Sequence, residues 1–282
     1  MTIGFIGQGW IGKNYADSFE ERGFTVVRYA LEEPFVQNKA KIAECDVVFI
    51  AVPTPTTSGG FSFDAVRSAL SCVGKGKIAV IKSTILPGTA RILQKEFPEI
   101  TVLFSPEFLR EANVRKDVDA PDRNIIGIMN EEQRSAAEKV MSILPEAPYK
   151  IICTAEEAEF IKYAGNTFLY MKVVYMNMLY DLAQTFGGNW ESIAKTMSAD
   201  PRIGTSHMHP VHPSGHTTVA GRGAGGHCFI KDFAAFSRFY REQVKDALGS
   251  EVFTALEKKN ESLLRVSGKD IDLLESVYGV SR

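Results

Sequence analysis

The sequence has little cysteine. Its four cysteines stand at positions 45, 72, 153 and 228, and no two of them form a Cys-x-x-Cys pair. Disulfide-stapled proteins are short chains with many closely spaced cysteines, which this sequence is not. A chain of 282 residues can bury a core without disulfide bonds, so we expect reduced thiols and a cytoplasmic location.

Basic charge and long apolar runs are also missing. The chain carries 32 basic and 34 acidic residues, for a net charge of −2, which argues against a nucleic-acid partner held by bulk electrostatics. No uncharged apolar run approaches roughly 18 residues, so we expect no membrane span, and the N-terminus has no basic, cleavable leader. At roughly 100–200 residues per domain, the length predicts two domains.

The first half of the sequence alternates between two hydrophobic patterns. Apolar β-type runs predict strands at 2–6, 25–29, 46–52, 77–81, 101–104, 124–128 and 149–153. Amphipathic helical patterns lie between several of them, at 10–22, 63–72 and 131–144. This alternation predicts an α/β fold whose N-terminal domain, residues 1–153, is a Rossmann-type doubly wound parallel sheet.

After residue 153 the pattern becomes helical. Thr154 and Glu157 form a capping box, and a helix is predicted from 155 to 186, ending at a pair of glycines. At about 1.5 Å per residue, this helix spans roughly 48 Å, too long for one small core to cover. We therefore expect an all-α domain over 154–282 with a long central helix, and a homodimer built on that helix.

A glycine-rich turn follows the first predicted strand. Gly7, Gly9 and Gly12 form the pattern in which one glycine permits the tight turn, one lets backbone approach a pyrophosphate, and one allows close helix packing. With Trp10 and Ile11, this turn opens a helix whose N-terminus attracts phosphate. The turn predicts a dinucleotide-binding site.

The acidic residue that usually completes this pattern is missing. It should end the second strand about 20 residues further on and accept the ribose hydroxyls, but the position near Ala30 is apolar, with Glu32 and Glu33 as substitutes. We expect NAD, bound more weakly than usual. Arg28 keeps NADP open as an alternative, although an exposed arginine with no ligand is the simpler interpretation.

Seven short motifs follow one another along the chain. They are AVPTPT at 51–56, KST at 82–84, SPEFLRE at 105–111, PDR at 121–123, KYAGN at 162–166, DPRIG at 200–204 and GGHCFIKD at 225–232. In this order they resemble the UDP-glucose/GDP-mannose dehydrogenase family. Members of that family oxidise the primary alcohol of a nucleotide sugar to a carboxylate with two NAD⁺.

The resemblance implies a catalytic set. Its members are Thr84, Glu107, Lys162, Asn166, Cys228 and Asp232. Cys228 matches the nucleophile that captures the aldehyde as a thiohemiacetal and then a thioester. Lys162 and Asn166, four residues apart on one predicted helix face, match residues that stabilise oxyanions and position a water. Asp232 matches the partner of that water in proton transfer, and Glu107 a carboxylate associated with thioester hydrolysis.

The resemblance also implies binding residues. Beyond the glycine turn, those for the cofactor are Thr54, Ser83, Thr84, Glu111 and Lys231. Those for the nucleotide sugar are Glu107, Phe108, Leu109, Arg110, Glu111, Lys162, Asn166, Arg202 and Gly225. Arg202 matches an arginine that reaches the substrate across a dimer interface.

The sequence departs from the family pattern in its length and in one loop. The family normally continues into a third domain that grips the nucleotide, which we expect to be absent here. Between Gly204 and Gly225 lies an apparent insertion with four histidines, at 207, 209, 212 and 216. Their spacing could suit a transition metal, but no nearby Cys, Asp or Glu completes a ligand set, so we expect a polar loop and no metal.

Two other functions compete with a nucleotide-sugar 6-dehydrogenase. A two-domain hydroxyacid-type dehydrogenase would use the same cofactor fold for one hydride transfer, but needs no thiol such as Cys228. A catalytically degenerate homologue that only binds nucleotide would fit the missing ribose carboxylate. The retained motif residues at 162, 166, 228 and 232 oppose the degenerate reading.

Overall fold

The computed structural model describes residues 1–110 and 113–279. The chain divides into two compact units. Unit 1 contains Met1–Pro55 and Ser62–Lys162, and unit 2 contains Thr56–Phe61 and Tyr163–Arg282. No helix in the described part of the chain is both long enough and apolar enough to cross a membrane.

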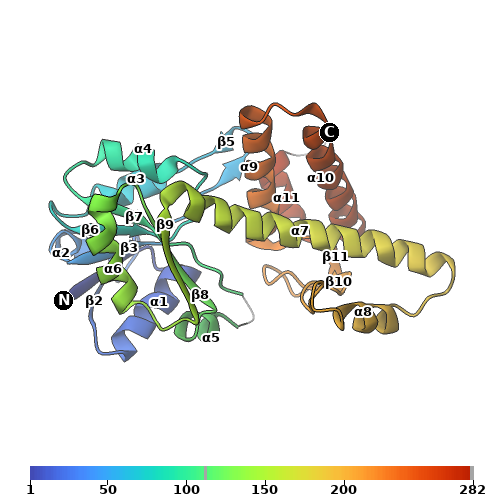
Figure 1. The fold of residues 1–282 in the computed structure, drawn as a ribbon, viewed down its shortest axis with the longest axis horizontal. Helices are drawn as coiled ribbons and strands as arrows, with labels where there is room; N and C mark the ends of the chain where they lie inside the picture. Colours follow the sequence, from blue (N-terminus) through green and yellow to red (C-terminus); the bar gives the residue numbers. More distant parts are fainter. Residues whose placement is uncertain (111–112, 280–282) are drawn as a thin grey trace. The chain divides into compact units, whose positions relative to one another are not determined.

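Unit 1 is built on a seven-stranded sheet (Figure 1). Its strands are β1 (Thr2–Ile6), β2 (Thr25–Tyr29), β3 (Val47–Ile50), β6 (Ile78–Ile81), β7 (Thr101–Phe104), β8 (Arg123–Ile128) and β9 (Tyr149–Thr154). Their order is β2-β1-β3-β6-β7-β8-β9. The central strands β3 and β6 are buried at every residue, because helices cover both faces of the sheet. The predicted α/β fold is confirmed.

The helices of unit 1 form two layers around this sheet. They are α1 (Trp10–Glu21), η1 (Val36–Asn38), α2 (Lys39–Ile42), α3 (Asp64–Leu70), α4 (Thr89–Glu96), α5 (Val114–Asp119), η3 (Glu131–Gln133) and α6 (Arg134–Ile143). On one face α1, α5 and α6 pack with the strands into a core in which Phe5 stacks on Phe49 and meets Phe19 edge-on. Figure 1 places α3 and α4 across the sheet from α1 and α5.

The sheet differs from the predicted all-parallel one at β8. This strand runs antiparallel to β7, with Phe104 opposite Gly127, and parallel to β9. Parallel neighbours need a crossover, usually through a helix that packs across the sheet. The only described helix between β7 and β8 is the six-residue α5, which packs against α1 instead.

Unit 2 is helical apart from two short strand pairs. Its helices are α7 (Ala155–Thr185, which begins in unit 1), α8 (Trp190–Ser198), α9 (Gly226–Gln243), α10 (Ala247–Ser267) and α11 (Ile271–Tyr278). The pairs are β4 (Thr56–Thr57) with β5 (Gly60–Phe61), and β10 (Val211–His212) with β11 (Gly221–Arg222). The hairpin 56–61 comes from the first quarter of the sequence, and Arg238 of α9 donates to the carbonyl of Thr57.

The long helix α7 begins where the capping box predicts. The Thr154 amide donates to the Glu157 carboxylate at 2.9 Å, and the Glu157 amide donates to the Thr154 hydroxyl at 3.3 Å. These two bonds satisfy backbone donors that the first turn of a helix leaves unpaired. The helix stops before Gly187, whose φ of +69° suits glycine.

Candidate active site

The glycine turn of unit 1 has the geometry of a phosphate cradle. Gly7 has a φ of +91°, and a Cβ there would lie 2.2 Å from the carbonyl oxygen of Ala51. A Cβ on Gly12 would lie 1.9 Å from the carbonyl oxygen of Gly7, whereas a Cβ on Gly9 would meet nothing within 4 Å. Gly9 caps α1 with no side-chain hydrogen bond. There is therefore open space beside Gly9 at the start of α1, where a dinucleotide of this fold places its pyrophosphate.

The charge around β2 bears on the choice between NAD and NADP. Arg28 donates to two carboxylates of α1, lying 2.7 Å from Asp17 and 2.6 Å from Glu20. Its side chain is only 13% exposed. Both carboxylates neutralise the guanidinium and would repel a ribose 2′-phosphate. The arrangement does not favour the NADP alternative.

Three predicted cofactor residues follow the carboxyl ends of the neighbouring strands β3 and β6, where open α/β sheets bind ligands. They are Thr54, Ser83 and Thr84. All three are buried. The Thr54 hydroxyl donates to the carbonyl of Thr84 at 2.7 Å. The Ser83 hydroxyl donates to the carbonyl of Val52 at 2.7 Å and accepts from its amide at 2.9 Å. These two hydroxyls tie the strand ends together, so their direct effect is on the shape of the loops.

Lys162 and Glu107 form a buried ion pair in unit 1. The ammonium of Lys162 lies 2.8 Å from the Glu107 carboxylate and also donates to the Glu107 carbonyl at 2.7 Å. The other carboxylate oxygen accepts from the Leu109 amide. Burial would raise the pKa of Glu107, but the attraction and hydrogen bond of Lys162 outweigh it and hold the pKa below its usual range. Two of the predicted catalytic residues therefore lie in contact.

A second buried lysine lies beside this pair and was not singled out from the sequence as a site residue. Lys82, the first residue of the KST motif, donates to the Ser105 hydroxyl at 3.2 Å and lies over the ring of Tyr15. Burial lowers its pKa to about 7; the Glu107 carboxylate opposes that change and Lys162 adds to it. Its signal in the sequence was a lysine directly after four apolar strand residues.

The remaining predicted substrate residues of unit 1 follow Glu107. Phe108 lies under the guanidinium of Arg123 at 3.7 Å and near the Lys162 ammonium at 5.4 Å. Leu109 packs against the sheet core. Arg110 is exposed, and its guanidinium pairs with Asp117. Glu111 lies outside the described residues.

The predicted nucleophile of unit 2 lies in the first turn of α9. Cys228 is exposed and is the third residue of this 18-residue helix. The N-terminal end of a helix favours a negative group in its first turn. Gly225, a predicted substrate residue, is the N-cap, and a Cβ there would lie 2.0 Å from the Asp270 carboxylate. A side chain at position 225 would therefore have to displace the Asp270 carboxylate.

Asn166 and Asp232 come together in unit 2. The Asn166 amide donates to one oxygen of Asp232 at 2.7 Å, and the Lys231 ammonium donates to the other at 2.5 Å. Asp232 is 1% exposed. Three predicted site residues thus form one hydrogen-bonded group, and the amide of Asn166 is held in a defined orientation.

Arg202 is placed apart from these groups. Its side chain is 88% exposed and pairs with Asp200, two residues away in the same loop. Within residues 1–110 and 113–279, no buried partner of Arg202 is found. Its predicted role across a dimer interface therefore depends on a second copy.

The histidines of the apparent insertion do not converge. His209 lies 3.7 Å from Glu191, His212 contacts Lys269, and His216 contacts His227 and Asp272. Within the ranges that the structure describes, no group of three or more His, Cys, Asp or Glu side chains is arranged to hold a metal.

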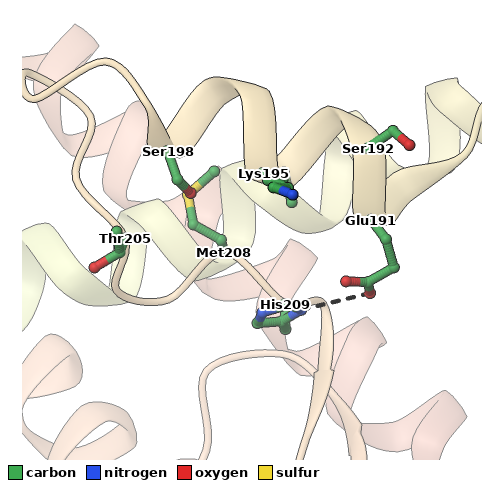
Figure 2. Close-up of a pocket in the computed structure, with 8 residues that line it drawn as sticks. Glu191, Ser192, Lys195, Ser198, Thr205, Met208 and His209 are labelled. Atoms are coloured by element: carbon green, nitrogen blue, oxygen red, sulfur yellow. Dashed lines mark ion pairs between the residues drawn. The ribbon is translucent and has the colours of Figure 1, made fainter.

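A hollow of about 440 Å³ lies between α8 and the loop 205–209 (Figure 2). Figure 2 shows Glu191 and His209 facing each other at its edge. Its lining is Glu191, Ser192, Ala194, Lys195, Ser198, Thr205, Met208 and His209. None of these is a predicted site residue, so this hollow is not the candidate active site.

Two polar residues near the C-terminal end hold the loop that leads into α9. Asn260 accepts from the amide of Ala224 at 2.7 Å and donates to its carbonyl at 2.9 Å. Asp270 accepts from the amide of Gly226 at 2.8 Å. The prediction from sequence missed both, because a polar residue inside a helical pattern gives no sign of a partner some 40 positions away.

Comparison with known proteins identifies the family. The model of the UDP-glucose/GDP-mannose dehydrogenase family, NAD binding domain, matches residues 33–144, and the model of its central domain matches residues 156–262. The chain belongs to the UDP-glucose/GDP-mannose dehydrogenase family. Because the first model is that of an NAD binding domain, family membership indicates NAD as the cofactor.

Individual relatives show how much of a family member the chain spans. A UDP-glucose 6-dehydrogenase of Rhizobium meliloti is 35% identical over 215 residues, which are 70% of this chain and 46% of that protein. A UDP-glucose dehydrogenase of Pyrobaculum islandicum superposes with a TM-score of 0.79 and 28% identity, over 100% of this chain and 72% of that one. The chain spans about half the length of the curated relatives it matches.

A hydroxyacid dehydrogenase shares the fold. The 3-hydroxyisobutyrate dehydrogenase of Mycobacterium tuberculosis superposes with a TM-score of 0.68 over 98% of both chains, at 16% identity. At this identity the likeness is one of fold alone, and it bears only on architecture.

Proposed function

We propose that the chain catalyses the NAD-dependent oxidation of a nucleotide-sugar primary alcohol to the carboxylate, as a UDP-glucose 6-dehydrogenase does. Membership of the family supports this reaction class. The observation that carries the proposal is the retention of two ordered polar groups: Lys162 with Glu107, and Asn166 with Asp232 and Lys231. A degenerate homologue has no reason to keep such buried polar pairs, which cost free energy to desolvate.

In this proposal unit 1 binds the cofactor and unit 2 supplies the nucleophile, in keeping with domains at 1–153 and 154–282. The start of α1 holds the pyrophosphate, with the loops around Thr54, Ser83 and Thr84 shaping the rest of the cofactor site. NAD⁺, when bound, would supply the hydride acceptor, and two NAD⁺ in succession would each take one hydride per sugar. The residues of this chain bind the sugar, hold the reacting oxygen and move protons around it.

Cys228 forms the covalent intermediate. Its sulfur adds to the aldehyde carbon and gives a thiohemiacetal, from which loss of the second hydride leaves a thioester. Lys162 and Asn166 stabilise the negative oxygen at both stages, an interaction whose removal typically costs roughly 3–4 kcal/mol. Asp232 takes the proton of the water that cleaves the thioester, and Glu107 assists that hydrolysis by keeping Lys162 charged.

The test is the stoichiometry of NADH release from UDP- and GDP-sugars. The wild-type chain should release two NADH per sugar and form the acid. Cys228→Ser should abolish acid formation while NAD binding, measured by calorimetry, stays near the wild-type value, because the serine hydroxyl is a far weaker nucleophile.

Cys72→Ser is the matched control, since Cys72 is a thiol of unit 1 outside the proposed site. It should leave both acid formation and NAD binding unchanged. A Cys228→Ser protein that still releases two NADH per sugar at the wild-type rate would remove the thiol from the mechanism. Production of a ketone with one NADH would instead identify a hydroxyacid-type dehydrogenase.

We also propose a cytoplasmic homodimer formed through α7. Its apolar residues Phe168, Met171, Tyr175, Met178 and Leu182 are between 36% and 61% exposed. They follow one another at spacings of three and four residues, the spacing of a seam between packed helices. A second copy would cover this stripe and would offer Arg202 a substrate site in the partner.

A further inference from the structure

The loop that carries His207, His209, His212 and His216 is here called the histidine loop. Three contacts join it to the segment that follows α10. His212 meets the ammonium of Lys269 at 3.3 Å, the Ser214 hydroxyl donates to Asp270 at 2.8 Å, and His216 meets Asp272 at 2.8 Å. Positions 212, 214 and 216 of the loop thus meet positions 269, 270 and 272 of the segment. Lys269 and Asp270 are buried, so this junction is built into the unit rather than lying loosely on it.

At the outer end of this junction, three side chains form a hydrogen-bonded series. Nε2 of His216 lies 2.8 Å from the Asp272 carboxylate, and Nδ1 of His216 lies 3.0 Å from Nε2 of His227. The two imidazole rings are perpendicular, with centroids 4.6 Å apart. Because a carboxylate can only accept, His216 donates from Nε2, and the two facing ring nitrogens share one proton.

The series ends one residue before the proposed nucleophile. His227 and Cys228 are the second and third residues of α9, and both are exposed. The Asp270 carboxylate holds the Gly226 amide directly before them at 2.8 Å. The junction that places His216 therefore also holds the first turn of α9, which carries His227 and Cys228.

We propose that Asp272, His216 and His227 form a proton-holding series that stabilises the thiolate of Cys228. This inference deepens the proposed function, in which Cys228 is the nucleophile. The thiol proton leaves sulfur, the electron pair stays on sulfur, and the proton is taken up by the two imidazoles. His227 and His216 are positioning residues: they supply a cation close to the thiolate, and Asp272 stabilises that cation.

The charged groups around the series agree with this direction of proton transfer, from the Cys228 thiol to the imidazoles. The hydrogen bond from His216 holds the pKa of Asp272 below its usual range, so the carboxylate is charged at neutral pH. On α9 itself, Lys231 lies four residues after His227, and its charge is shared with Asp232. From the other elements, Lys269 is paired with His212 and backbone carbonyls, and Asp270 with Ser214 and Gly226.

The test is the rate at which iodoacetamide alkylates Cys228 between pH 5 and 9, followed by mass spectrometry of the Cys228 peptide. Asp272→Asn keeps an acceptor for His216 but removes the charge, and His216→Gln interrupts the series. Either change should lower the Cys228 rate at pH 7 by roughly threefold at low salt, and His227→Gln by about tenfold, because one pKa unit changes the thiolate fraction tenfold. High salt should shrink the Asp272→Asn effect, since that carboxylate is 68% exposed.

Two controls separate this effect from damage to the fold. His209→Gln changes a histidine of the same loop that lies outside the series. It should leave the rate of Cys228 alkylation at each pH as in the wild type. Cys72, in unit 1, should react at the wild-type rate in every variant. Unchanged Cys228 rates in Asp272→Asn and His216→Gln would overturn the proposal, and so would an equal loss in His209→Gln.

Nitrogen-detected NMR of the imidazoles gives a second, independent readout, since the chain has only five histidines. His216 should be protonated at Nε2, the nitrogen that faces the Asp272 carboxylate. Neither measurement uses a sugar nucleotide. A wild-type chain that shows both signatures but releases no NADH would refute the proposed reaction and leave the thiolate series intact.

Discussion

Lys82 is the residue whose environment departs most from what its sequence context suggests. It follows the buried strand β6 and is 2% exposed, next to one carboxylate, Glu107, and a second ammonium, Lys162. One carboxylate cannot fully compensate two buried cations. Burial is the main cause that lowers the pKa of Lys82 to about 7; Glu107 opposes this change and Lys162 adds to it.

The stability of the protein should therefore depend on pH through Lys82. The pKa is lower in the folded state than in the unfolded chain, so between pH 7 and about 10.5 the unfolded chain binds more protons and stability rises with pH. In Lys82→Met this contribution is absent. The difference in unfolding free energy, wild type minus variant, should rise by up to about 1.4 kcal/mol per pH unit from pH 7 to 9 and be flat below pH 6.

Urea titrations at pH 5.5 to 9 measure this difference. Lys75→Met is the control, because it removes a lysine whose side chain is 77% exposed. A Lys82→Met difference that stays flat from pH 7 to 9, as expected for Lys75→Met, would mean that Lys82 remains charged in the folded protein.

At the scale of elements, the turn between β1 and α1 and the strand β2 together determine cofactor choice. The turn offers backbone donors to a pyrophosphate, and these do not distinguish NAD from NADP. The distinction falls to Arg28 on β2, which α1 occupies with Asp17 and Glu20. The packing of α1 against β2 thus pairs Arg28 with carboxylates of the protein itself. Arg28 is the cation that the sequence suggested for a 2′-phosphate.

We expect calorimetric titration to show tighter binding of NADH than of NADPH. The two carboxylates around Arg28 should disfavour an added phosphate, and like-charge repulsion should weaken as salt is raised. Asp17→Asn with Glu20→Gln should narrow the gap by releasing the guanidinium, whereas Asp64→Asn, at an exposed arginine pair elsewhere in unit 1, should not. Preference of the wild type for NADPH would reverse the assignment.

At the scale of the whole molecule, the exposed apolar stripe on α7 supports the proposed homodimer. Five large apolar side chains, each at least 36% exposed and repeating on one helix face, are more than a monomer normally leaves in water. A self-complementary seam on one helix suits a twofold dimer, in which the same stripe of each copy meets the other.

Light scattering at micromolar concentration should give twice the chain mass of 31.1 kDa. Tyr175→Glu, at the middle of the stripe, should shift the protein to a monomer because it would bury a charge against apolar side chains. Gln184→Glu adds the same charge to an exposed α7 position off the stripe and should leave the dimer intact. A monomeric wild type would contradict the proposed assembly.

The sequence by itself determined the elements whose signals are local. The strands β1, β2 and β7 have the predicted bounds, and the Thr154–Glu157 capping box begins α7 where expected. The glycine turn was predicted as well, because positive φ at Gly7 and close packing at Gly12 leave no alternative residue. Periodicity, capping and turn chemistry act over a few residues, so one sequence suffices to read them.

Only the tertiary structure decided what depends on distant residues. It reversed β8 against β7, grouped the hairpin Thr56–Phe61 with unit 2, and paired Arg28 with α1. It also joined His216 to Asp272, 56 positions away, and surrounded Lys82 with charges from 25 and 80 positions along the chain. The charge state and hydrogen-bond partners of a side chain follow from burial and neighbours, and these are set by packing between elements that the local pattern does not encode.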